Sequence, residues 1–361
     1  MEKRLKAVYF VEDAGAEDPG HGAAVAAEMD RAVQALRAAG FRSGILYFPK
    51  ETLDRTGTPN KNGSPDQFQR DLRDHYLPCA DSREFDLPCT DSREFDFEET
   101  LFLCDRAELL RRLRAEGCYA AGYSHAENAG ESFSGALYVL QEPDLVDRDS
   151  YCKIYEREAG LPWTILETQR CLVREFTAED LDGIYGLYDE LARRFLEPPS
   201  ADRAHEASIL RAYIDRIYRL YGFGHWAVLE KPAGRLIGRI GFAAVTAQQE
   251  REALELGVRG PGGAAGNNGQ AWSGIDADFG FLVAASHRGK GIAEEVGRAL
   301  LRYGFESLGF EKVRADARID NRASIRLLQK LGFEQAGTVP GDDGSRGIQR
   351  VVFLRTTQNV T

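Results

Sequence analysis

The feature that most constrains the fold of this chain is a glycine-containing turn between a strand and a helix. Residues 276–286 are short, apolar and partly alternating, as in a β-strand. Residues 292–308 place apolar side chains at helical spacing and charged ones on the opposite face. The turn between them reads His-Arg-Gly-Lys-Gly-Ile-Ala (287–293). Because glycine lets a ligand approach the backbone and the first N–H groups of a helix attract anions, the pattern predicts an anion site. The alternative is a tight turn with solvated charges.

The composition suits about two domains with a substantial core. Of the 361 residues, 43% are hydrophobic and 29% are charged. The sequence has no run of 18 apolar residues and no secretory signal, so we expect no membrane association. Its six scattered cysteines, without a CxxC pair, favour a reducing cytoplasm and predict no metal site. The net charge of −11 argues against nonspecific nucleic-acid binding.

Residues 1–146 alternate between strand and helix patterns. We expect strands at 6–11, 44–49, 100–105, 119–125 and 136–141, and helices at 23–40 and 106–117. This alternation predicts a small Rossmann-like α/β domain with a mainly parallel sheet. Residues 147–162 follow as a connecting helix, stopped by Gly160 and Pro162.

This first unit loosely resembles a reduced haloacid-dehalogenase-like domain. That family uses two aspartates one residue apart after its first strand, whereas this strand ends in Glu12-Asp13-Ala14-Gly15. Asp105 follows the third strand alone and is interpreted as a helix N-cap. His125 and Asn128 are interpreted as parts of a surface turn. The unit is therefore predicted to be non-catalytic, serving either in docking or in the formation of a homodimer.

The second unit, residues 163–356, combines three motifs in a fixed order. The segment 165–191 predicts a strand and a capped helix. Arg288 to Ala293 match a phosphate-loop signature of glutamine or arginine, two residues, glycine, one residue, then glycine or alanine. A second signature is Asp-Asn-Arg-Ala-Ser (320–324), followed by Leu-Gly-Phe (331–333). Together these motifs strongly resemble the GNAT superfamily of acyl-CoA-dependent N-acetyltransferases. The opening segment looks like that of the branch that acetylates ribosomal-protein N-termini and assorted small amines.

The resemblance implies an α/β fold. We expect a C-terminal GNAT fold, which is a mixed, mostly antiparallel central sheet with a splayed parallel strand pair and flanking helices. It would follow the small Rossmann-like domain. Acetyl-CoA, as co-substrate, would lie between the splayed strands 279–284 and 313–318. No metal is implied.

The resemblance also assigns the acetyl-CoA contacts. Backbone N–H groups of the turn would take the pyrophosphate, and the backbone near Leu282 and Val283 would hold the pantetheine and polarise the thioester carbonyl. Asn321 and Ser324 would contact the pantetheine or the phosphate arm, although Asn321 only capping its helix is an equal alternative. The implied binding residues are Leu282, Val283, Arg288, Gly289, Lys290, Gly291, Ile292, Ala293, Asn321 and Ser324.

Catalysis requires a neutral amine, because an ammonium has no lone pair. The branch often carries a glutamate where this chain has Asp278, which is therefore the candidate base. The alternative is a surface carboxylate. The family often has a tyrosine as general acid where this chain has Leu328, which leaves the acid step unassigned.

An insertion at residues 246–275 replaces a short turn of the family. Its glycine-rich part (261–269) is expected to be mobile, and the segment is either a lid on the acceptor face or unselected slack. The leading function is acetyl transfer to a primary amine of a small molecule or a peptide or protein N-terminus. The alternative is a catalytically lapsed, CoA-binding regulatory module.

A direct repeat gives a first prediction. Residues 77–86 and 87–96 are identical at nine of ten positions, as expected of a recent duplication in a tolerant loop. A metal site at the two cysteines is the alternative, but they do not form a CxxC pair. Deletion of either single copy should leave soluble expression and acetyl transfer unchanged. Loss of either property would contradict the prediction.

Overall fold

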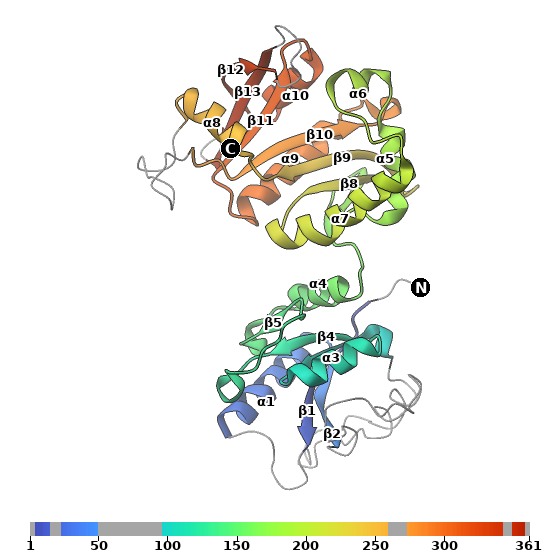
Figure 1. Ribbon diagram of the computed structural model, residues 1–361, viewed down its shortest axis with the longest axis vertical. Coiled ribbons are helices and arrows are strands. Elements are labelled where there is room, and N and C mark those ends of the chain that lie inside the picture. The colour runs from blue at the N-terminus through green and yellow to red at the C-terminus, as the bar shows by residue number, and fades with distance from the viewer. Residues whose placement is uncertain (1–3, 15–22, 50–95, 259–272, 342–348, 358–361) are drawn as a thin grey trace. The chain divides into compact units, whose positions relative to one another are not determined.

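The computed structural model describes residues 4–14, 23–49, 96–258, 273–341 and 349–357. The repeat at 77–96 lies outside the described residues apart from Asp96, and the glycine-rich segment 261–269 lies wholly outside them. The chain divides into two compact units, Met1–Trp163 and Thr164–Thr361 (Figure 1). None of the described helices is both long and apolar enough to cross a membrane.

The first unit is built on a five-stranded parallel sheet with the order β2-β1-β3-β4-β5. The strands are β1 (Ala7–Ala14), β2 (Arg42–Pro49), β3 (Thr100–Cys104), β4 (Tyr119–Tyr123) and β5 (Val139–Leu140). The helices are α1 (Ala23–Ala38), α3 (Ala107–Ala115) and α4 (Arg148–Glu158). All five residues of β3 are buried, as is usual for a parallel strand covered on both faces.

Helices cover both faces of this sheet. Met29 of α1 and Tyr151 of α4 belong to one hydrophobic cluster, and Leu110 of α3 belongs to another. The segment 147–162 is therefore not only a connector, because its helix contributes buried side chains to the core of the first unit.

The start of α3 differs from the sequence interpretation. Arg106, not Asp105, is the N-cap residue and its side chain makes no capping bond. Instead, the Ala107 N–H donates to the carboxylate of Glu131, 2.7 Å away. Asn128 donates to the carbonyl oxygens of Asp105 and Tyr123, which ties the ends of β3 and β4 together. The loop after β4 therefore holds the ends of two strands together and is not a simple surface turn.

The second unit is a mixed, mostly antiparallel sheet with the order β12-β13-β11-β10-β9-β8-β7-β6, as predicted. The strands are β6 (Thr164–Glu167), β7 (Cys171–Arg174), β8 (His225–Glu230), β9 (Arg235–Ala243), β10 (Ala277–Val283), β11 (Lys312–Arg318), β12 (Glu334–Pro340) and β13 (Gln349–Thr356). The helices are α5 (Leu181–Leu187), α6 (Glu190–Phe195), α7 (Arg203–Tyr221), α8 (Ala247–Glu255), α9 (Ile292–Glu306) and α10 (Arg322–Lys330).

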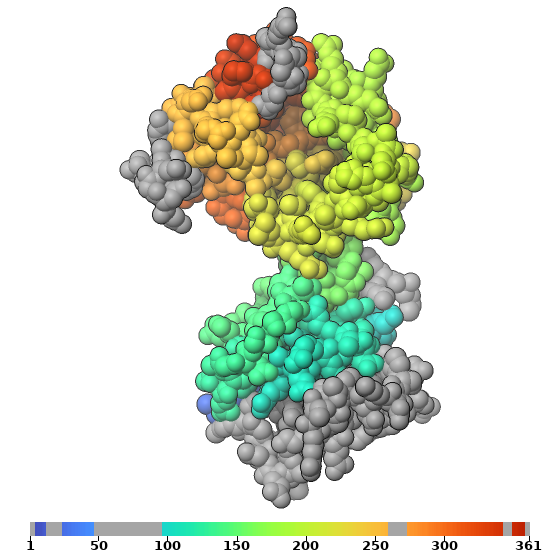
Figure 2. All heavy atoms as spheres, viewed as in Figure 1, coloured from blue at the N-terminus to red at the C-terminus, as the bar shows by residue number. Residues whose placement is uncertain are grey.

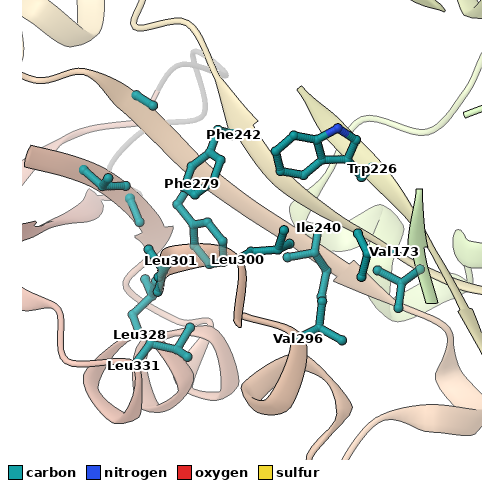
Figure 3. Close-up of a cluster of buried hydrophobic side chains, with 14 of the residues drawn as sticks. Val173, Trp226, Ile240, Phe242, Phe279, Val296, Leu300, Leu301, Leu328 and Leu331 are labelled. Atoms are coloured by element: carbon teal, nitrogen blue, oxygen red, sulfur yellow. The ribbon is translucent and has the colours of Figure 1, made fainter. Parts of the chain in front are cut away.

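The two faces of this sheet carry different helices. Val296 of α9 and Leu328 of α10 pack with Phe279 in the main core (Figure 3). On the other face, Ile184 of α5 and Leu210 of α7 form a smaller cluster. Figure 1 shows α8 near the β12–β13 end of the sheet and α5 and α7 near its β8–β9 end.

Part of the insertion at 246–275 is an ordered helix that the sequence analysis did not predict. Thr246 and Gln249 form a reciprocal capping box at the start of α8. This Thr-x-x-Gln pattern is a known signature of a helix start and was available in the sequence.

Candidate active site

The turn between β10 and α9 presents a row of unpaired backbone donors. Gly289 and Gly291 have φ values of 73° and 79°, a left-handed conformation that favours glycine. Within the described residues, no protein acceptor takes the backbone N–H groups of residues 289–294, while Glu295 N–H bonds to Gly291 O. Such a run of N–H groups at the positive end of a helix is an anion-binding cradle. The residues of the turn therefore fit the pyrophosphate of acetyl-CoA.

Gly291 is not the first helical residue but the left-handed N-cap of α9. A side chain there would be strained by about 1–2 kcal/mol. Substitutions of Gly291 would therefore lower the stability of the unit as well as alter the cradle, so a neighbouring residue is the better probe.

Two arginines hold the cradle in place. Both terminal nitrogens of Arg288 bond to the carboxylate of Asp189, each at 2.8 Å, and its Nε donates to Val283 O at 2.9 Å. Arg170 bonds to the Glu295 carboxylate at 2.6 Å and donates to Lys290 O at 2.8 Å. The side chain of Arg288 therefore fixes the turn to the start of α6, and only its backbone is left to face a ligand.

Removal of the Asp189 carboxylate should loosen the cradle. The hydrogen bonds from Arg288, and then that from the Ala192 N–H, lower the pKa of Asp189 to about 2. Asp189→Ala should weaken acetyl-CoA binding several-fold, because Arg288 loses its bidentate partner and α6 loses its N-cap. Calorimetric titration of acetyl-CoA measures this. Asp182→Ala, at an exposed position on α5, is the control; equal affinities of the two variants would contradict the assignment.

The opening between the parallel strands is visible in their register. β10 and β11 pair only at Ala277↔Val313 and Asp278↔Arg314, near the start of both strands. Beyond Asp278, the described part of β10 has β9 as its one strand partner. Its free side presents unpaired backbone groups to which an amide-containing pantetheine arm can bond.

The alternation along β10 shifts one of the expected contacts. Leu282 pairs with Arg239, and its carbonyl oxygen lies 3.0 Å from the ideal Cβ position of Gly238, so its backbone faces β9. Successive residues face opposite sides, so Phe281 and Val283 face the opening. The expectation for Leu282 is corrected by one residue to Phe281, and the Val283 carbonyl is already taken by Arg288.

Asn321, which was expected to contact acetyl-CoA or to cap its helix, caps the start of α10. Asn321 Oδ1 accepts a hydrogen bond from the Ser324 N–H at 3.1 Å, so Asn321 caps the helix. Leu328 is fully buried in the core (Figure 3). Position 328 therefore has no opening toward a leaving thiolate.

Asp278 belongs to a group of five charged side chains. Arg314, which is fully buried, lies 2.5 Å from Asp278, 2.8 Å from Asp316 and 3.2 Å from Glu252. Arg350 bonds to Glu252 and Asp316 as well. Because three carboxylates face two guanidinium groups, one carboxylate lacks a full counter-charge. The group also joins α8 to β11 and β13.

Asp278 has the electrostatics of a proton acceptor. Burial raises its pKa to about 6, although the charge of Arg314 acts in the opposite direction. Its side chain keeps 19% of its surface exposed, so a proton can reach it. A carboxylate with a pKa near the working pH is suited to general-base catalysis.

The C-terminal unit matches a known family of enzymes. Residues 170–334 match the acetyltransferase (GNAT) domain family. The C-terminal unit contains a GNAT domain, and its activity is that of an N-acetyltransferase, for which acetyl-CoA is the usual donor.

The chain is also similar to three individual proteins. The chain is 27% identical over 177 residues to the uncharacterized N-acetyltransferase YoaA of Bacillus subtilis, covering 48% of this chain and 85% of that protein. It is 24% identical to the uncharacterized N-acetyltransferase p20 of Bacillus licheniformis, covering 50% and 89%. A GNAT-family acetyltransferase structure from Bacillus anthracis superposes with a TM-score of 0.41 at 15% identity, covering 53% of this chain and 97% of that one.

Proposed function

We propose that the C-terminal unit transfers an acetyl group from acetyl-CoA to a primary amine of a small molecule or of a peptide N-terminus. The observation that carries this proposal is that three features follow one another along β10 and the turn after it. Asp278 lies at the start of the strand, the unpaired edge runs along it, and the cradle follows its end.

Acetyl-CoA supplies the acyl group as a thioester. The N–H groups of residues 289–294 would hold its pyrophosphate, and the free edge at Phe281 and Val283 would hold its pantetheine and polarise the carbonyl. Asp278 would accept the proton that the amine loses as its nitrogen attacks the carbonyl carbon. Since position 328 offers only a buried leucine, we assign protonation of the thiolate to solvent.

We propose that the first unit is a Rossmann-like, non-catalytic module for docking or for dimerisation. Its strand order is one that doubly wound sheets adopt. The Glu131 carboxylate occupies the start of α3, where such folds often receive an anionic ligand. The four described cysteines are free thiols, which supports a cytoplasmic location.

The test is an assay of the full chain with acetyl-CoA and a panel of primary amines, read by mass spectrometry of the acetylated product and by thiol release. We expect product from at least one amine. Acetyl-CoA binding without product from any amine would instead support the lapsed, CoA-binding module.

A further inference from the structure

The sheet face that carries Asp278 also carries His225 and Arg239. Residues paired across neighbouring strands lie on the same face of a sheet. His225 pairs with Gly241, which pairs with Gly280 of β10, and Arg239 pairs with Leu282. Asp278, Gly280 and Leu282 alternate along β10 and so share this face. Figure 2 shows the unit hollowed between α8 (orange) and α5–α7 (yellow-green).

Gly280 makes room for the imidazole of His225, and Gly241 makes room for the backbone that carries it. A Cβ atom at Gly280 would lie 2.5 Å from His225 Nε2, and one at Gly241 would lie 2.8 Å from His225 Cα. The ring therefore lies directly over the backbone of Gly280. Because Gly280 is two residues from Asp278, the ring and the candidate base are separated by roughly 7 Å along the strand.

His225 and Arg239 present only hydrogen-bond donors to this hollow. Arg239 Nη2 lies 3.3 Å from His225 Nδ1. A guanidinium can only donate, so Nδ1 accepts and Nε2 carries the proton of a neutral ring. Burial, followed by the charge of Arg239, lowers the pKa of His225 to about 3, which keeps the ring neutral at physiological pH.

Arg239 differs from two other arginines on this face of the sheet, Arg314 and Arg350, in its bonded partners. Arg314 and Arg350 each bond to two or more carboxylates. For Arg239, by contrast, His225 is the one bonded partner among the residues that the structure describes, and it is uncharged. A half-buried guanidinium without a counter-charge is costly unless a ligand supplies one.

We propose that Arg239 and the Nε2–H of His225 bind a carboxylate of the acceptor, so that the acceptor is an amino acid whose carboxylate lies a few bonds from the acetylated amine. This inference rests on the acetyl transfer proposed above and names its substrate class. The planar fork of the guanidinium matches the two oxygens of a carboxylate. Gly241 and Gly280 have no side chains on this face, so there is space for the short chain that links the carboxylate of the acceptor to its amine beside Asp278.

The test compares α-, β- and γ-amino acids with their own carboxamides as acceptors at saturating acetyl-CoA. For the best pair, wild-type kcat/KM should favour the amino acid by about 10- to 100-fold, as expected of a hydrogen bond between charged groups. Arg239→Gln should reduce this preference to within about threefold, and Arg239→Lys should restore part of it. Arg235→Gln, at the exposed start of the same strand, is the matched control and should keep the wild-type preference.

A second measurement does not depend on turnover. Calorimetric titration of the best amino acid into the protein saturated with CoA should show binding that its carboxamide lacks and that Arg239→Gln abolishes. Carboxamides accepted as well as amino acids would overturn the inference and leave the acetyl transfer standing. Failure of every amine while acetyl-CoA still binds would overturn both.

Discussion

Replacement of Asp278 by asparagine is expected to lower kcat/KM for acetyl transfer by about 100-fold at pH 7, with little change in the affinity for acetyl-CoA. General-base catalysis contributes about 10²- to 10⁴-fold, and asparagine preserves the shape of the side chain without its basicity. Burial raises the pKa of Asp278 to about 6, so wild-type activity should rise with pH through about 6 as this carboxyl loses its proton. The variant should lack this rise. Steady-state kinetics from pH 5 to 9 provide the measurement.

Stability separates loss of the base from loss of the fold. An aspartate whose pKa is raised in the folded state stabilises the protein below its unfolded pKa, and this contribution is lost as the pH rises through about 6. Asparagine resembles the protonated form, so the variant should melt no lower than wild type at pH 7–8. Asp316→Asn removes one carboxylate from the same charged group but keeps Asp278, and its loss of activity should be much smaller. Similar losses in both variants would mean that the charged group matters only as a scaffold.

Reversal of charge at Lys290 should weaken acetyl-CoA binding by about 100-fold or more. Lys290 is exposed between the two left-handed glycines but does not itself have a positive φ, so glutamate fits there without strain. Its carboxylate would stand among the N–H groups of the cradle and repel the pyrophosphate. The free energy of unfolding without ligand should change by less than about 0.5 kcal/mol, as for most surface substitutions.

Thermal unfolding with and without acetyl-CoA measures this effect. At a ligand concentration 100 times the wild-type dissociation constant, wild type should gain about 2.7 kcal/mol, whereas a variant with 100-fold weaker binding gains about 0.4 kcal/mol. Arg302→Glu makes the same charge change at an exposed position of α9, three turns from the cradle, and should behave as wild type. Equal ligand-induced shifts in all three proteins would remove the assignment of the pyrophosphate site.

Local patterns were sufficient for the parts of the site that lie within one stretch of chain. The proposed cradle is a strand, a turn and a helix in sequence, so glycine spacing and periodicity predicted its local structure. Glycine spacing alone does not show that Gly291 is the left-handed N-cap of α9. Tertiary partners were also missed. Arg314 and Glu252 lie 62 positions apart, and Arg288 and Asp189 lie 99 apart. Charge pairing at such separations depends on which strands become neighbours, and α8 had to be recognised before Glu252 could be assigned to this face.

The Glu131 carboxylate at the start of α3 affects how the stability of the first unit depends on free anions. A domain that leaves such a helix end vacant gains stability when its anion is abundant and loses it when the anion is scarce, since binding to the folded state shifts the folding equilibrium. In this unit the negative charge at the start of α3 belongs to the side chain of Glu131, so it is present whatever the concentration of free anions. The stability of this helix start should therefore be the same in phosphate-rich and phosphate-poor conditions.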